Sequence, residues 1–82
     1  MLNVERDALF LRKVHKIRDN AKKEKVKKLI KKILENPGVG KPMRYSRKGT
    51  REVYLAPLRL SYAYIEKENK VIFLDVYHKD EQ

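Results

Sequence analysis

The sequence predicts an α+β fold in which an N-terminal helical hairpin packs on one face of a small antiparallel β-sheet. Up to Glu35 the apolar residues recur at helical spacing, whereas from Arg51 they alternate with a period of two. The segment Asn36-Pro37-Gly38 separates the two patterns and ends the helical part. With 82 residues, the chain is expected to form one domain over residues 1–82.

Two helices are expected in the N-terminal half. The first covers about residues 5–18, and its apolar face consists of Phe10, Val14 and Ile17. Asp19-Asn20 interrupts this helix and offers an N-cap for a second helix over Ala21–Glu35. The second helix carries an amphipathic stripe, which consists of Val26, Leu29, Ile30, Ile33 and Leu34. A short break between two such helices indicates a hairpin whose lysines face outward.

Three strands are expected after residue 50. The first places Glu52 and Tyr54 on the face opposite Val53, and Pro57 marks its end. The second strand, residues 59–65, separates Arg59 from the side that holds Leu60, Tyr62 and Tyr64.

A turn at Glu66–Asn69 leads from the second strand to the third, Val71–Tyr77. This third strand is nearly all apolar, which indicates a strand that is buried on both sides or one that the helices cover. Before these strands lies a linker over residues 39–49, in which a further short strand is expected at Met43–Tyr45.

The charge is strongly positive and lies mainly in the helical half. The net charge is +10, and residues 12–32 hold eleven Lys or Arg against two acidic residues, which gives +9. Such a surface attracts a polyanion, with strong salt dependence, although a solvated lysine-rich helix face has the same composition. The candidate RNA-binding residues are Lys22, Lys25, Lys28, Lys32, Lys41, Arg44, Arg47, Lys48 and Arg51.

Several classes of protein are excluded by composition. The chain has no cysteine, and His15 and His78 have no carboxylate at ligand spacing, so we expect no disulfide, structural zinc or other cofactor. No apolar run approaches the roughly 20 residues of a membrane span. The first residues lack a signal-peptide pattern, so a cytoplasmic location is expected.

The candidate site lies on the strands. Arg59 interrupts an apolar strand on the open face, where it could hold a phosphate bidentately or pair with an acidic residue of a neighbouring strand. His78 and Lys79 end the last strand, and a histidine there can donate a proton to a leaving 5′-oxygen. Tyr54 shares its face with Glu52 and can stack on a base.

In these features the chain resembles the RelE/ParE family of toxins from type II toxin–antitoxin systems. The resemblance covers nearly the whole chain and is carried by three motifs, which are Arg51–Leu55 followed by Leu58–Tyr62, the ending Tyr77-His78-Lys79, and Gly40-Lys41-Pro42. It implies a metal-free, ribosome-dependent messenger-RNA endoribonuclease of the RelE/YoeB-like branch. In that reaction the ribose 2′-oxygen attacks the adjacent phosphate and gives a 2′,3′-cyclic phosphate.

The resemblance also implies roles for single residues. Arg59 would stabilise charge on the phosphate, His78 would be the general acid, and Lys79 and Tyr54 would complete the catalytic set. Met43 stands where the YoeB branch has its catalytic glutamate, which leaves Glu52 as a substitute for the general base.

Partners follow from the same resemblance. A cognate RelB-like antitoxin with an acidic, disordered segment would neutralise the toxin, and messenger RNA and the ribosome would be its targets. Two alternatives remain open at this point, namely a ParE-like inhibitor of DNA gyrase and a non-catalytic basic RNA-binding domain.

Overall fold

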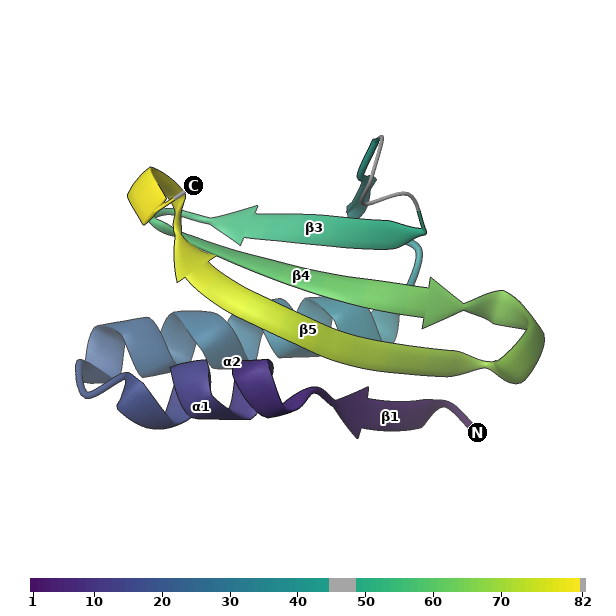
Figure 1. The fold of residues 1–82 in the computed structure, drawn as a ribbon, viewed down its shortest axis with the longest axis horizontal. Helices are drawn as coiled ribbons and strands as arrows, with labels where there is room; N and C mark the ends of the chain where they lie inside the picture. Colours follow the sequence, from purple (N-terminus) through teal and green to yellow (C-terminus); the bar gives the residue numbers. More distant parts are fainter. Residues whose placement is uncertain (45–48, 82) are drawn as a thin grey trace.

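The computed structural model describes residues 1–44 and 49–81. Within these residues five strands form one mixed sheet in the order β1-β5-β4-β3-β2, and the two α-helices pack against it (Figure 1). In chain order the elements are β1 Asn3–Arg6, α1 Ala8–Lys16, α2 Asn20–Glu35, β2 Lys41–Pro42, β3 Thr50–Leu55, β4 Leu58–Ile65, the 3₁₀ helix η2 Glu66–Glu68, β5 Lys70–His78 and the 3₁₀ helix η3 Lys79–Glu81. The predicted α+β class is confirmed.

The N-terminal segment differs from the prediction. Residues Asn3–Arg6 form strand β1, parallel to β5, where the sequence predicted the start of a helix. The N–H of Asn3 donates to the carbonyl of Asn69 at 2.8 Å, and the N–H of Asp7 donates to that of Phe73 at 2.8 Å. The sheet is therefore mixed, because this short edge strand joins the predicted antiparallel strands β3, β4 and β5.

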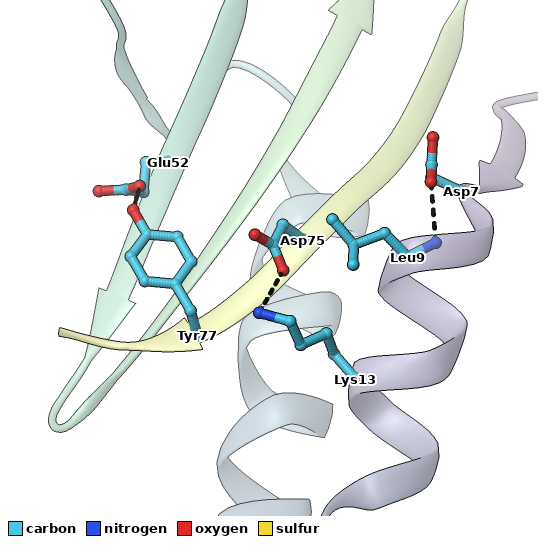
Figure 2. Close-up of polar contacts among 6 residues, drawn as sticks. All are labelled: Asp7, Leu9, Lys13, Glu52, Asp75 and Tyr77. Carbon is cyan, nitrogen blue, oxygen red and sulfur yellow. Dashed lines mark hydrogen bonds and ion pairs between the residues drawn. The ribbon is translucent and has the colours of Figure 1, made fainter. Parts of the chain in front are cut away.

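Both helices begin at aspartate caps. The Asp19 side chain accepts the N–H of Ala21 at 2.8 Å, which confirms the predicted N-cap of α2. The Asp7 side chain does the same for Leu9 at the start of α1, at 2.9 Å (Figure 2). Each cap satisfies an N–H group that has no partner inside the helix, an effect of about 1 kcal/mol.

The core lies between the helices and one face of the sheet. Phe10 of α1 stacks on Phe73 of β5, with 5.3 Å between the ring centroids. The other buried apolar residues are Val26, Leu29, Ile33, Val53, Leu58, Leu60, Tyr62, Val71 and Val76. Burial of each large apolar side chain contributes about 1.5–3 kcal/mol, so this layer fixes how the helices sit on the sheet.

A β-bulge in β5 changes the face of the residues that follow it. Tyr62 pairs with Phe73, whereas Ser61 pairs with Asp75, so Leu74 is an extra residue between the two pairs. Residues beyond the bulge therefore alternate in the opposite phase. As a result Val76 and His78 face the helices, and Tyr77 faces the open side of the sheet.

The short strand before β3 lies earlier than predicted. It is β2, Lys41–Pro42, which pairs with Glu52 and Arg51. The predicted position was Met43–Tyr45, of which Tyr45 lies outside the described residues. The N–H of Met43 donates to the carbonyl of Thr50 at 2.9 Å and continues this pairing. In the described part of the chain no helix has the length and apolar character needed to cross a membrane.

Candidate functional site

A polar cluster lies on the face of the sheet that the helices leave open. Glu52 of β3, Arg59 of β4 and Tyr77 of β5 come from three adjacent strands. One Arg59 Nη is 3.2 Å from Glu52 Oε1, and the Tyr77 hydroxyl donates to Glu52 Oε2. Figure 2 shows the Tyr77 side chain reaching across to Glu52. Only 10% of the Glu52 side chain is exposed, and its carboxylate accepts hydrogen bonds from both Arg59 and Tyr77.

Arg59 lies on the open face, as the alternation of β4 predicted. It also forms an ion pair with Glu52 of the neighbouring strand, which the sequence offered as the alternative to a phosphate contact. Its guanidinium carbon lies 5.4 Å from the centroid of the Tyr54 ring, a cation–π contact. About a third of its side chain is exposed. Within the described residues its Nε is buried without a hydrogen-bond acceptor, which leaves a donor of the guanidinium unused.

A hollow of about 420 Å³ adjoins this cluster. Its lining consists of Lys41, Pro42, Met43, Arg44, Glu52 and Arg59. Two of the predicted RNA-binding residues, Lys41 and Arg44, thus lie beside the ion pair of Glu52 and Arg59. The hollow has positive charge on its rim and a guanidinium at its wall, which suits a phosphate group.

The strand β2 is held at this position by contacts on the other face of the sheet. The buried Tyr62 hydroxyl accepts the N–H of Gly40 and donates to the carbonyl of Pro37, both at 2.8 Å. Arg51 donates to the carbonyls of Gly40 and Gly38, at 2.8 and 3.2 Å. These bonds fasten the loop after α2 to the sheet and so place the residues that line the hollow.

Gly40 is required for this close approach. A Cβ added there would lie 2.6 Å from the Tyr62 hydroxyl and 2.9 Å from Cβ of Arg51. Burial raises the pKa of the Tyr62 hydroxyl, an effect that the Gly40 N–H and the charge of Arg51 partly offset. Arg51 therefore acts on the helix-facing side as a residue that positions the loop, and it lies apart from the open-face cluster.

His78, the last residue of β5, lies on the opposite face of the sheet from Arg59. Arg59 pairs with Tyr77, and Leu58 pairs with His78, so the histidine lies on the helix-facing side of the sheet. The N–H of Asp80 donates to His78 Nδ1 at 3.3 Å. Lys79 begins η3 and is exposed, and its N–H donates to the carbonyl of Pro57 at 2.9 Å. Of the four predicted catalytic residues, the structure brings Tyr54 and Arg59 together, places His78 on the opposite face of the sheet, and leaves Lys79 exposed at the start of η3.

The basic residues of α2 do not form a single outward surface. Lys25 is half-buried, and its Nζ donates to the carbonyl of Ala56 at 2.7 Å, so it fastens α2 to the β3–β4 turn. Lys22 is also half-buried, whereas Lys28 and Lys32 are exposed. The prediction that all of these lysines face outward is therefore wrong for Lys25. The remaining candidates, Arg47 and Lys48, lie outside the described residues.

Tyr77 is the residue of the cluster that sequence reasoning did not select. Strict alternation from Phe73 would turn Tyr77 toward the helices, and the bulge turns it outward. One signal was available, because the same alternation would also have placed the charged Asp75 against the core. A charged residue at a core position of an apolar strand indicates a bulge.

The fold and the cluster define a class of protein. Two helices on a five-stranded mixed sheet are the architecture of RelE-like toxins. A family model described as the ParE toxin of type II toxin–antitoxin system, parDE, matches residues 4–82. The chain therefore belongs to this family and is a type II toxin with the RelE/ParE fold.

Solved structures agree with this assignment. A chain of the toxin–antitoxin complex RelBE2 from Mycobacterium tuberculosis is 26% identical, with a TM-score of 0.80, over 94% of this chain and 96% of that chain. A chain of the intact E. coli RelBE complex is 20% identical, with a TM-score of 0.78, over 95% and 96%. The YoeB/ParE toxin from Agrobacterium tumefaciens is 17% identical, with a TM-score of 0.78, over 94% and 98%. A comparison with curated proteins found no match.

Proposed function

We propose that this toxin is a ribosome-dependent messenger-RNA endoribonuclease that acts at the open-face cluster. The observation that carries the proposal is Arg59, which is held between Glu52 and Tyr54 beside a hollow with Lys41 and Arg44 on its rim. The guanidinium has a buried Nε without an acceptor within the described residues, and a bidentate phosphate contact would use it once the side chain turns toward the ligand.

The proposed reaction is a transesterification in RNA. The 2′-oxygen forms a bond to the adjacent phosphorus while the bond from phosphorus to the 5′-oxygen breaks, giving a 2′,3′-cyclic phosphate and a free 5′-hydroxyl. Arg59 stabilises the charge that develops on the phosphate oxygens. Because the phosphate competes with Glu52 for Arg59, the carboxylate becomes available to take the proton of the 2′-hydroxyl.

Tyr77 is a positioning residue in this proposal, since its hydroxyl bond orients the Glu52 carboxylate. The leaving 5′-oxygen takes its proton from solvent. His78, the acid expected from the family resemblance, lies on the other side of β5 from Arg59. It therefore has no part in proton transfer at this phosphate.

Two partners follow from the proposal. The exposed lysines of α2, among them Lys28 and Lys32, dock on ribosomal RNA through contacts with phosphates. A cognate antitoxin of the RelB type neutralises the toxin, which is supported by the RelBE and RelBE2 complexes among the similar structures. Binding of such a partner also stabilises the folded toxin by mass action.

Induced expression with mapping of transcript 5′ ends tests the proposal. The wild type arrests growth and cleaves messenger RNA, and Arg59→Ala or Glu52→Gln reduces cleavage by about 10²–10⁴-fold. Lys67→Ala, in the exposed 3₁₀ helix η2, keeps cleavage within a few-fold of the wild type. If Arg59→Ala and Glu52→Gln cleave like the wild type, the cluster is not the active site.

A second candidate is inhibition of DNA gyrase, and the match to a ParE family model favours it. A toxin of that kind arrests growth with intact transcripts and inhibits DNA supercoiling by purified gyrase. Growth arrest without new transcript ends, together with gyrase inhibition by the purified protein, would replace the ribonuclease proposal with this one.

A further inference from the structure

A second cavity lies on the other side of β5 from Arg59. It has a volume of about 310 Å³ and lies between the α1–α2 turn and the ends of β4 and β5 that face it. In Figure 1 the α1–α2 turn, the β3–β4 turn and the C-terminal end of the chain lie at the same end of the molecule. His78, which the open-face cluster does not use, lines this cavity.

The rim of the cavity is positively charged. Lys16, Arg18 and Lys22 line it, and among the described residues none of these three forms an ion pair. Two further charged residues of the lining already have partners. Lys13 Nζ lies 3.3 Å from an Asp75 carboxylate oxygen (Figure 2), and Asp19 caps α2. Three cations therefore remain for an anionic ligand.

The floor of the same cavity is apolar. It is formed by Ile17 of the α1–α2 turn, Leu58 of β4 and Val76 of β5, with Tyr77 beside them. His78 adds a ring with a polar edge, whose Nδ1 lies 3.3 Å from the Asp80 backbone nitrogen and 3.5 Å from an Asp80 carboxylate oxygen. A cationic rim above an apolar floor matches a nucleotide, whose phosphate is charged and whose base is largely apolar on its faces.

We propose that this cavity binds one nucleotide of the substrate RNA, away from the scissile phosphate. Arg18 and Lys22 contact its phosphate, and the base or ribose lies on the floor next to His78. The choice of RNA as the ligand rests on the proposed function. Tyr77 and His78 are consecutive and point to opposite faces of β5, so a strand that passes the end of β5 reaches both the Arg59 hollow and this cavity.

The test measures binding without cleavage. The probe is a fluorescent single-stranded RNA of about ten nucleotides with 2′-O-methyl riboses, which cannot form the cyclic phosphate. Fluorescence anisotropy compares Arg18→Ala and Lys22→Ala with a matched control, Lys67→Ala, in the exposed turn at the far end of the β4–β5 hairpin. Each cavity variant weakens binding by roughly tenfold, and each lowers the slope of log affinity against log salt by about 0.7.

NMR of the two histidine rings locates the bound nucleotide. Addition of the same RNA shifts the His78 ring signals in the wild type and in Arg59→Ala, and the shift is lost in the double variant Arg18→Ala/Lys22→Ala. His15, which is exposed on α1 outside the cavity lining, serves as an internal reference. Equal shifts at His15 and His78, or wild-type affinity in both single cavity variants, would overturn the proposal.

The two proposals fail separately. Loss of binding in the cavity variants with no cleavage of any transcript would support the cavity and refute the ribonuclease. Cleavage that depends on Arg59, with wild-type affinity in Arg18→Ala and Lys22→Ala, would leave the ribonuclease standing and refute the cavity. Thermal unfolding of each variant confirms that it is folded before its affinity is compared.

Discussion

Tyr62 connects the sheet to the loop that leads into β2, and its hydroxyl can be removed with almost no change in shape. In Tyr62→Phe the Gly40 N–H loses its acceptor and the Pro37 carbonyl loses its donor, two bonds of 2.8 Å each. Gly40 is buried, so its N–H cannot turn to bulk water without moving the loop. A buried donor left without a partner costs about 1–3 kcal/mol.

That cost has a measurable size in a domain of 82 residues. A loss of 1 kcal/mol lowers the melting temperature by about 4–8 °C at this length, so Tyr62→Phe is expected to melt roughly 5–20 °C below the wild type. Thermal and urea unfolding give the two free energies. The control is Tyr64→Phe, which removes a hydroxyl from a half-buried tyrosine on the same face of β4.

The same variant tests the pKa of the hydroxyl. Burial raises the pKa of Tyr62 in the folded state, so the folded protein holds this proton more tightly than the unfolded chain. The resulting stabilisation is complete below pH about 10 and is lost as the pH rises through the folded pKa. Alkaline destabilisation should therefore be steeper in the wild type than in Tyr62→Phe. A variant as stable as Tyr64→Phe, with an unchanged alkaline profile, would refute this account of the loop.

Three further outcomes are expected. Gly40→Ala destabilises the fold by about 1–3 kcal/mol in urea unfolding, because the added methyl group overlaps Tyr62 and a neighbouring Cβ that belongs to the sheet. Lys25→Met costs about 1 kcal/mol in the same assay, since the bond to the Ala56 carbonyl is lost, whereas a Lys31→Met control on the exposed face of α2 changes stability by less than 0.5 kcal/mol. Hydrogen bonds to the carboxylates of Glu5 and Glu68 raise the pKa of Lys70. The stabilisation that these bonds give is complete below pH about 10.4 and is lost as the pH rises through the raised pKa of the folded state. The Lys70→Met protein is therefore expected to lose less stability than the wild type as the pH rises above about 10.

The parts of the fold that the sequence predicts are those with strong local signals. The second helix has an apolar stripe and an aspartate cap, and the structure has the cap and buries Val26, Leu29 and Ile33 of the stripe, whereas Leu34 is exposed. Arg59 is placed on the open face because β4 alternates without interruption from Leu58 to Tyr62. By contrast, β1 is four residues long and has one half-buried residue, Val4, so its pairing with β5 depends on tertiary contacts that the segment itself does not encode.

The candidate site was predicted in part for a related reason. A single extra residue, Leu74, reverses the alternation of β5. As a result Tyr77, and not His78, lies on the open face. Periodicity cannot locate such a residue, although the charge of Asp75 in an apolar strand marks the region. The pairing of Glu52 with Arg59 depends on the register between β3 and β4. Pro57 predicts a turn between these strands, but it does not predict which residues face each other across them.

Cleavage by purified protein on ribosomes programmed with a defined messenger RNA tests the central claim most directly. The products are mapped to single nucleotides, and their 3′ ends are examined for a 2′,3′-cyclic phosphate. The wild type is expected to give such ends, Arg59→Ala to give at least a hundredfold less product, and Lys67→Ala, in the exposed η2, to remain within a few-fold of the wild type. Intact messenger RNA with the wild-type protein, or equal cleavage by Arg59→Ala, would contradict the claim.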